Sequence, residues 1–398
     1  MNDYKAWRAI LCALAVIVCL LGLEVYADTE ANHSARSRYE PEVVAIVELL
    51  RLGDLEAALK AADRHVVAFP KSRIGYLLRA DILHAMSSTG LSAVLAKSPV
   101  VEGLQKQIGA RWQHSQAHYA EQMVPASLIE LGSHKHIIVA DMQHGRLYLY
   151  KNVEGVPKLI SDYYLTVGSA GFGKSFEGDN KTPIGVYSIY QHLLSRELPD
   201  LYGEGAFPVN YPNRYDRSLK RTGYGIWLHG TPSDTYARPP WASEGCFVLS
   251  NPDLLEIQQF IDVPGKTPVI LSDAIKWVSL EQLSARKKQL LNVLEQWRND
   301  WESLNTEAYL AHYSKDNFNF GQKNFAAWSA RKRQVNRAKT FVQVDMDVES
   351  LFVYPGEYDM FVVKYKQRYL SNNYSGEVSK QQYWQRNQHG QWKILYEG

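Results

Sequence analysis

The spacing of apolar residues changes at His136, and this change divides the chain into parts that cannot share one architecture. Upstream, apolar side chains recur at intervals of three and four residues, as they do on one face of a helix. Downstream, short apolar runs are separated by long loops rich in Gly, Pro and Asn, which is typical of strands and their connections. We therefore expect a multidomain α+β protein with a helical N-terminal region.

Two helices account for the upstream spacing. The first carries Leu55, Ala58, Leu59, Ala62 and Val66 on one face. After Pro70 the second repeats this pattern with Ile74, Leu77, Leu78, Ile82 and Ala85. The pair resembles one tetratricopeptide-like hairpin, and another helix is expected near residues 100–123. Because one hairpin cannot bury both of its faces, we assign residues 28–130 to a helical region that packs on a neighbour and serves docking rather than chemistry.

Residues 136–273 are predicted to form an antiparallel β domain whose loops carry function. Strands are expected at 137–141, 146–150, 161–168, 185–191, 226–229 and 268–271. A second, smaller α+β domain is predicted at 280–398. It begins with a helical stretch to about Tyr313, continues with a half-exposed strand near 363–369, and ends in a hairpin around Gly390.

The N-terminus has the pattern of a secretory signal. Lys5 and Arg8 precede an apolar run of 15 residues, and small residues follow up to Ala27. We expect cleavage after Ala27, so that residues 1–27 are removed and the protein resides in the periplasm. The run is shorter than the ~20 residues of a membrane-spanning helix, and an uncleaved membrane anchor is the alternative.

Export gives the cysteine count its meaning. Of three cysteines, Cys12 and Cys19 lie inside the predicted signal, so the mature chain keeps Cys246. An unpaired thiol in an oxidising compartment is either a buried small apolar group or a functional one. The neighbouring residues favour function, because His229-Gly230-Thr231 ends an apolar stretch and Ser243-Glu244-Gly245 leads directly to the cysteine.

These residue types suit nucleophilic catalysis. A thiol needs a base to become a nucleophile, and His229 supplies one if its second ring nitrogen donates to a carbonyl such as that of Gly230. Backbone N–H groups must also face the developing oxyanion, and a glycine before Cys246 allows close approach of the substrate.

A third motif makes the pattern specific. The stretch from Gly178 to Tyr187 (GDNKTPIGVY), together with the histidine and cysteine motifs, resembles the L,D-transpeptidase catalytic domain (the YkuD family). The resemblance covers about residues 136–273. One departure is Glu244, which stands where the commonest family motif has His. A carboxylate beside the thiol raises its pKa unless it points away, and it puts the choice of acceptor in doubt.

The resemblance implies a β-sandwich-like domain in which Cys246 is the nucleophile and His229 the general base. Gly245 and Cys246 match the positions whose N–H groups form the oxyanion hole, and Ser243 matches the residue that holds the loop. The implied substrate is the tetrapeptide stem of peptidoglycan, cut between meso-diaminopimelate and the terminal D-alanine. The implied chemistry proceeds through a thioester and needs no metal or organic cofactor.

The domain order adds a looser resemblance to cell-shape-determining L,D-carboxypeptidases, whose C-terminal domain is similar to the NTF2-like fold. Five aromatic residues are candidates to line a pocket there, with plain core packing as the favoured alternative: Trp297, Trp301, Tyr309, Tyr313 and Trp328. Related enzymes that lack the usual motif histidine include hydrolases of links between peptidoglycan and a lipoprotein.

Other residues were weighed for binding. Asp179 and Lys181 are candidates to contact substrate charges or, in the favoured interpretation, to hold a loop next to Pro183. Arg238 is the better candidate for a substrate carboxylate, because its fork matches one. His134, His136 and His144 lack an accompanying metal-binding pattern, so no metal is expected. With a formal net charge of only +2, no nucleic-acid partner is expected either.

The sequence thus predicts a periplasmic cysteine L,D-transpeptidase acting on peptidoglycan stems in wall remodelling and cell shape. An L,D-carboxypeptidase or a peptidoglycan–lipoprotein linkage hydrolase with the same Cys/His site is the first alternative. A non-catalytic wall-binding scaffold is the second. A third makes the helical and C-terminal parts the functional ones, through binding to other cell-wall proteins.

Overall fold

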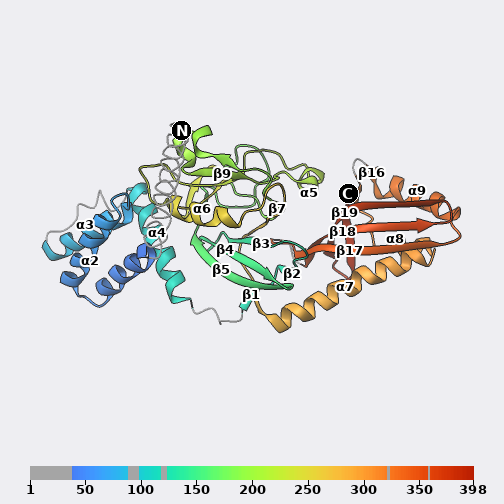
Figure 1. Ribbon diagram of the computed structural model, residues 1–398, viewed down its shortest axis with the longest axis horizontal. Helices are drawn as coiled ribbons and strands as arrows, with labels where there is room; N and C mark the ends of the chain where they lie inside the picture. The colour runs from blue at the N-terminus through green and yellow to red at the C-terminus, as the bar shows by residue number, and fades with distance from the viewer. Residues whose placement is uncertain (1–37, 88–97, 118–122, 321–322, 357–358) are drawn as a thin grey trace, which may run out of the picture.

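A computed structural model of the chain describes residues 38–87, 98–117, 123–320, 323–356 and 359–398. The predicted signal peptide lies outside these residues. Within the described ranges, no helix is both long and apolar enough to cross a membrane. Figure 1 shows three parts in a row: helices at one end, a β domain in the middle and a long-stranded sheet with helices at the other end.

Helices form the N-terminal part. They are residues 38–51, α2 (Leu55–Ala68), α3 (Arg73–Ser87) and α4 (Pro99–Gln116). The spacing of apolar residues predicts α2 and α3, and their buried faces enclose a small core with Ile46, Ile74 and Ile82. α2 starts at Asp54, whose carboxylate accepts a hydrogen bond from the Ala57 N–H and satisfies one of the free donors of the first turn.

The end of the predicted helical region is wrong. Residues 28–130 were expected to be helical, but the structure places β1 at Met123–Pro125 and β2 at Leu128–Glu130. β1 pairs with β14 (Trp277–Ser279), and β2 pairs with β17 (Val342–Val353) in the C-terminal domain. Such short strands leave little local pattern, because they are stabilised by partners far away in the sequence.

Two sheets build the central domain. The first has the order β5 (Val156–Tyr164), β4 (Arg146–Val153), β3 (His136–Asp141), β13 (Pro268–Ser272) and β7 (Gly185–Ser188). The second has the order β12 (Phe247–Val248), β10 (Trp227–His229), β9 (Gly205–Pro208) and β8 (Leu193–Leu194). β6 (Val167–Gly168) pairs with β11 (Trp241–Ser243), and the short helices are α5 (Arg214–Ser218) and α6 (Asn251–Ile257).

The central domain is not purely antiparallel, which corrects the expectation from the sequence. β13 runs parallel to β3, and β12 runs parallel to β10. Parallel pairing needs a long crossover, and the chain supplies one between residues 142 and 267. Both sheets contribute to one core, in which Leu149, Leu228 and Phe247 are buried.

The first sheet is buried on both of its faces. Along β3, Ile138 and Ala140 point into the core between the two sheets, whereas Ile137 and Val139 point into a second core shared with the C-terminal domain. Successive side chains of a strand face opposite sides, so a continuous apolar run such as that of β3 requires cover on each side. The C-terminal domain supplies the second cover.

The C-terminal domain combines helices with a seven-stranded sheet of order β16-β15-β20-β19-β18-β17-β2. The strands are β15 (Asn319–Phe320), β16 (Lys323–Asn324), β17, β18 (Met360–Ser371), β19 (Tyr374–Arg386) and β20 (Trp392–Glu397). The helices are α7 (Leu280–Glu302), α8 (Thr306–Ala311) and α9 (Phe325–Arg337). A capping box of Ser279 and Gln282 starts α7, which runs alongside the sheet in Figure 1.

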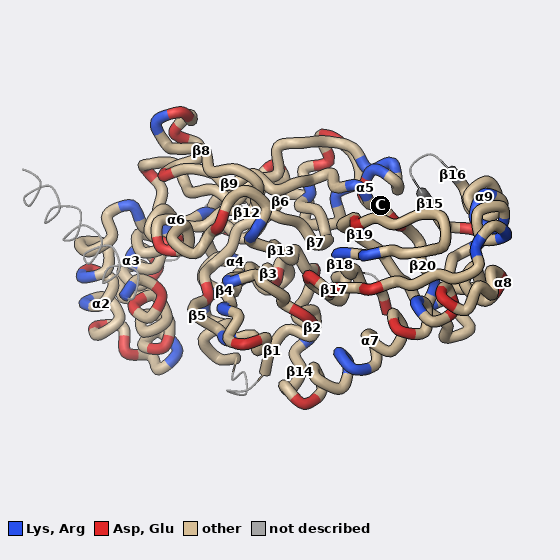
Figure 2. The backbone as a smooth tube through the Cα atoms, turned by 45° about the vertical axis from the view of Figure 1, so that its right-hand side comes forward, with Lys and Arg blue, Asp and Glu red and all other residues tan. Residues whose placement is uncertain are grey.

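The aromatic residues considered for a C-terminal pocket are mostly core. Trp297, Tyr309, Tyr313 and Trp328 are buried in the core shared with the central domain. Trp301 is also buried, yet it borders a cavity of about 340 Å³ lined by lysines and tyrosines of α9, β18 and β19. Figure 2 shows Lys and Arg interspersed with Asp and Glu in all three parts, so the small net charge is not gathered on one of them.

Candidate active site

Strand pairing brings the predicted base and nucleophile to the same side of the second sheet. Leu228 on β10 pairs in parallel register with Phe247 on β12, and both side chains enter the core. Side chains alternate along a strand, so His229, which follows Leu228, and Cys246, which precedes Phe247, both face away from that core. The pairing of Leu228 with Phe247 therefore fixes how the two reactive groups are placed relative to each other.

The His229 imidazole has a defined orientation. It is 3% exposed, and its Nδ1 lies 2.7 Å from the Gly230 carbonyl oxygen. A carbonyl only accepts hydrogen bonds, so Nδ1 carries the proton and Nε2 is left with a lone pair. This is the hydrogen bond that the sequence predicts. Burial lowers the pKa of His229 to about 4 against the opposing effect of this hydrogen bond, with a further lowering by the Arg238 charge.

The Cys246 thiol is partly exposed, and its Sγ donates to the Gly225 carbonyl oxygen at 3.2 Å. Burial raises the pKa of Cys246 to about 11. A backbone hydrogen bond to Trp227 and the Arg238 charge oppose this rise, whereas Glu244 adds to it. At neutral pH the pair is therefore a thiol and a neutral imidazole, and the thiol proton must turn from Gly225 toward His229 before it is transferred.

Ser243 holds the loop before the cysteine. Its Oγ donates to the Cys246 carbonyl at 2.6 Å and accepts from the Gly245 N–H at 3.2 Å. Being buried and engaged in this way, it is placed to shape the loop rather than to touch substrate. Gly245 has φ +120°, and a Cβ there would lie 2.8 Å from the Lys181 carbonyl oxygen. Its N–H already donates to Ser243, so its predicted part in an oxyanion hole stays a prediction.

The Gly230 N–H donates to the Tyr202 and Gly205 carbonyls at 3.0 and 3.4 Å. Gly230 thus serves the site through its own carbonyl, which orients His229.

Asp179 holds a loop, as the favoured interpretation of the sequence has it. Its carboxylate accepts from Lys174 Nζ at 2.7 Å and from the backbone N–H groups of Ser175, Phe176 and Lys181. Although burial by itself raises the pKa of Asp179, these hydrogen bonds lower it to about 2. Lys181 contributes its backbone, because its carbonyl lies against Gly245.

Among the predicted binding residues, Arg238 is the one whose charge acts on both Cys246 and His229. It is half-buried, and its charge lowers the pKa values of both Cys246 and His229. Burial lowers the pKa of Arg238 itself, and the neighbouring Cys246 acts in the opposite direction. Such a cation suits a carboxylate of the substrate or a thiolate that forms during reaction.

Sequence reasoning missed two residues that hold the histidine motif. Asn251, the first residue of α6, accepts from the Glu204 and Thr231 N–H groups and donates to the Thr231 carbonyl at 2.9 Å. The Tyr202 ring meets the His229 ring edge-on, with centroids 5.1 Å apart. No local motif marks either residue, since both act through contacts made only in the fold.

Two of the three histidines considered for a metal are engaged in hydrogen bonds with other groups. His134 Nδ1 bonds to the Lys266 carbonyl, and His144 Nδ1 bonds to Asp141. In the described part of the chain, no group of three or more His, Cys, Asp or Glu could hold a metal ion.

With this geometry in place, comparisons with known proteins define the domains of the chain. Residues 135–271 match the L,D-transpeptidase catalytic domain (YkuD), and residues 289–398 match the Cds6 C-terminal NTF2-like domain. The chain therefore consists of N-terminal helices, an L,D-transpeptidase-family β domain and an NTF2-like domain. This family acts on peptidoglycan stem peptides.

Solved structures support the arrangement of the two matched domains. Bd1075 of Bdellovibrio bacteriovorus is 26% identical, with a TM-score of 0.60, over 69% of this chain and 97% of its own. The helical cell shape determining protein Pgp2 of Campylobacter jejuni is 26% identical, with a TM-score of 0.58, over 68% of this chain and 95% of its own. No curated protein sequence matches the chain.

Proposed function

We propose that the chain is an L,D-transpeptidase that acts on peptidoglycan tetrapeptide stems, with Cys246 as nucleophile and His229 as general base. The observation that carries this proposal is the parallel pairing of β10, which ends at His229, with β12, which begins directly after Cys246, together with the imidazole oriented by Gly230. A neutral imidazole with a free lone pair is the state that a general base requires.

The proposed reaction begins at the carbonyl of the L-centre of meso-diaminopimelate. His229 Nε2 takes the thiol proton as Sγ forms a bond to this carbonyl carbon, and backbone N–H groups near Cys246 stabilise the oxyanion. The bond to nitrogen then breaks, and the proton passes from His229 to the amine of the leaving D-alanine. An acceptor amine attacks the thioester, gives its proton to His229, and releases the thiol.

Water is the second candidate for the acceptor, which would make the protein an L,D-carboxypeptidase. The similarity to the helical cell shape determining protein Pgp2 along 95% of that protein favours this candidate, because the domain order of the chain resembles that of cell-shape-determining L,D-carboxypeptidases. Both reactions share the thioester and differ only in the group that attacks it. Hydrolysis of a peptidoglycan–lipoprotein link would use the same chemistry on another leaving amine.

Product analysis separates these candidates. Purified protein would be incubated with disaccharide tetrapeptide, and the products resolved by mass. We expect cross-linked dimer, or exchange with an added D-amino acid, from the wild type; tripeptide alone would assign the water reaction. Cys246→Ala should abolish both. Wild-type protein without product and without a thioester adduct to a carbapenem would refute the proposal and favour a wall-binding scaffold.

We further propose a periplasmic location, which rests on the N-terminal signal pattern. Fractionation of cells that express a tagged chain would test it. Recovery of the mature protein in the osmotic-shock fluid is expected, whereas retention in the membrane fraction would favour the uncleaved anchor.

A further inference from the structure

The loop of residues 231–241 links the two halves of the candidate site. It follows His229 on β10 and leads through Arg238 into β11, which ends three residues before Cys246. The catalytic domain holds the start of this loop through Asn251 of α6, which accepts from the Thr231 N–H at 3.1 Å and donates to the Thr231 carbonyl at 2.9 Å. The middle of the loop, however, lies against the N-terminal helices.

Tyr236 makes the main contact with these helices. Its ring stacks on that of Tyr39, with centroids 3.7 Å apart and planes 9° from parallel, and meets Phe69 edge-on at 5.7 Å. Its backbone N–H donates to the Lys71 carbonyl at 3.2 Å. Tyr236 thus packs into the core of the helical part rather than into that of the catalytic domain.

A neighbouring contact requires a small residue. A Cβ on Gly103 of α4 would lie 3.0 Å from Cγ of Pro239, so α4 approaches the loop directly beside Arg238.

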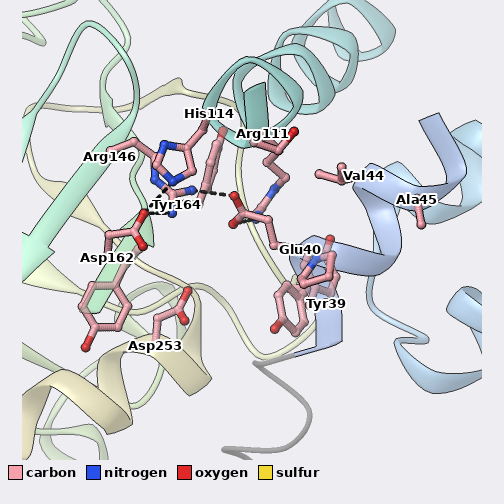
Figure 3. A pocket seen from close by; sticks show the side chains of 14 residues that line it. Tyr39, Glu40, Val44, Ala45, Arg111, His114, Arg146, Asp162, Tyr164 and Asp253 are labelled. Atoms are coloured by element: carbon pink, nitrogen blue, oxygen red, sulfur yellow. Dashed lines mark hydrogen bonds and ion pairs between the residues drawn. The ribbon is translucent and has the colours of Figure 1, made fainter. Parts of the chain in front are cut away.

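A second set of contacts connects α4 to Arg238 through β5. The Arg111 guanidinium of α4 lies over the Tyr39 ring at 5.0 Å and over the Tyr164 ring at 4.1 Å. The Tyr164 hydroxyl donates to the Arg238 carbonyl at 3.0 Å. Figure 3 shows the Glu40 carboxylate beside Arg111 and Arg146, with which it pairs at 2.7 Å in each case. The helix of residues 38–51, α4 and β5 therefore meet next to the backbone of Arg238, the cation of the site.

We propose that the N-terminal helices complete the active site by holding the 231–241 loop, which carries Arg238, in place between β10 and β11, with Tyr39 and Tyr236 as the positioning residues. The proposal rests on the proposed function in so far as Cys246 is the reacting group. Both family matches begin at residue 135 or later, so this role falls to a part of the chain that neither match includes. Without the helices, the 231–241 loop loses its main packing partner.

The rate of Cys246 alkylation by iodoacetamide, measured against pH on the full chain, tests this without any peptidoglycan substrate. The charged groups that act on this thiol are Arg238, Glu244 and Lys174. Tyr202, on whose pKa the Cys246 charge acts, meets the His229 ring edge-on. The alkylation midpoint is the pH at which the rate reaches half of its maximum. Arg238→Gln should raise this midpoint by about 1 pH unit, because the variant loses a positive charge that favours the thiolate. Tyr236→Leu and Tyr39→Leu should each move it in the same direction by about half that amount.

Two controls separate positioning from loss of stability. Tyr39→Phe keeps the stacked ring and should retain the wild-type midpoint. Arg79→Gln removes a pair with Asp63 at 2.6 Å, between α2 and α3 and away from the loop, and should also leave the midpoint unchanged. Circular dichroism at the assay temperature would show which variants are folded. If Tyr236→Leu does not fold, the comparison of Tyr39→Leu with Tyr39→Phe decides.

A double variant tests whether Tyr236 acts through Arg238. Tyr236→Leu combined with Arg238→Gln should shift the midpoint no further than Arg238→Gln alone. The proposal is overturned if folded Tyr236→Leu and Tyr39→Leu proteins keep the wild-type midpoint, or if Arg238→Gln does not move it. Failure of the proposed peptidoglycan reaction would leave these alkylation results standing, so the two hypotheses fail separately.

Discussion

The reacting pair illustrates how burial sets protonation at the scale of single residues. The Gly230 carbonyl orients the His229 ring, and removal from water keeps both the imidazole and the Cys246 thiol uncharged at neutral pH. The three motifs together, and the family that they resemble, nominate both residues. The pKa shifts were not predictable from the motifs, because desolvation depends on the atoms that pack around a group.

We expect alkylation of Cys246 to rise with pH through a midpoint near 11, because burial raises the pKa of this thiol to about that value. On the acid side, His229 becomes charged only near pH 4, where its lowered pKa lies. Glu244→Gln should lower the alkylation midpoint by less than about one unit, since a nearby negative charge is removed. Glu154→Gln, which removes an exposed carboxylate from the turn between β4 and β5, is the control. A midpoint below 8 would instead indicate a thiolate–imidazolium pair.

The backbone at Gly245 gives a second prediction. Gly245→Ala combines a positive φ with a Cβ 2.8 Å from the Lys181 carbonyl oxygen, whereas Gly173→Ala has a positive φ with nothing within 4 Å. The control should lose about 1–2 kcal/mol of unfolding free energy from strain alone. Gly245→Ala should lose about 1–3 kcal/mol more and also slow Cys246 alkylation. Equal denaturant midpoints for the two variants would contradict this.

At the scale of secondary-structure elements, buried charges join the helices to the catalytic domain. Arg146 of β4 is 3% exposed and pairs with both Glu40 of the first described helix and Asp162 of β5. Although burial by itself raises the pKa of Glu40, the charges of Arg146 and Arg111 lower it below its ordinary value. The spacing of apolar residues predicts β4 but not the helix that carries Glu40, nor the ion pairs, of which Arg146–Glu40 joins residues 106 positions apart.

Arg146→Met should destabilise the protein by about 3 kcal/mol, at the lower end for a broken buried ion pair, because Glu40 keeps Arg111 and Asp162 keeps His114 as a partner. Arg368→Met breaks an exposed pair with Asp345 and should cost less than about 1 kcal/mol. Both would be measured by urea unfolding. The lowered pKa of Glu40 adds stability at neutral pH that is lost as pH falls below its ordinary value, so the difference between wild type and Arg146→Met should shrink in acid. A constant difference would argue against this network.

Across the whole molecule, one core continues from the catalytic domain into the NTF2-like domain. Tyr215 of α5 stacks on Tyr383 of β19 with centroids 4.2 Å apart, and β2 extends the C-terminal sheet. Ile137 and Val139 of β3 lie in this same core. The catalytic domain therefore depends on its neighbour to cover one face of its first sheet, which is unlike two domains joined by a linker.

Calorimetry should accordingly show one cooperative transition for these two domains. Tyr215→Ala should lower its free energy by about 3–5 kcal/mol, as expected for an aromatic side chain lost from a core. Tyr224→Ala, at a residue 77% exposed, should change it by less than about 0.5 kcal/mol. Two separate transitions, with Tyr215→Ala affecting only one of them, would show that the domains unfold independently.

The amino-acid sequence by itself determined the helices of the N-terminal part, the principal strands and the order of the Gly178–Tyr187, His229 and Cys246 motifs. These features follow from local backbone preference and side-chain periodicity, which neighbouring residues are enough to specify. Only the tertiary structure decided that β2 joins a distant sheet, that the Arg238 charge acts on the thiol, and that the candidate nucleophile and base are both uncharged. Those properties arise from packing and desolvation among residues far apart in the chain, and no local pattern encodes them.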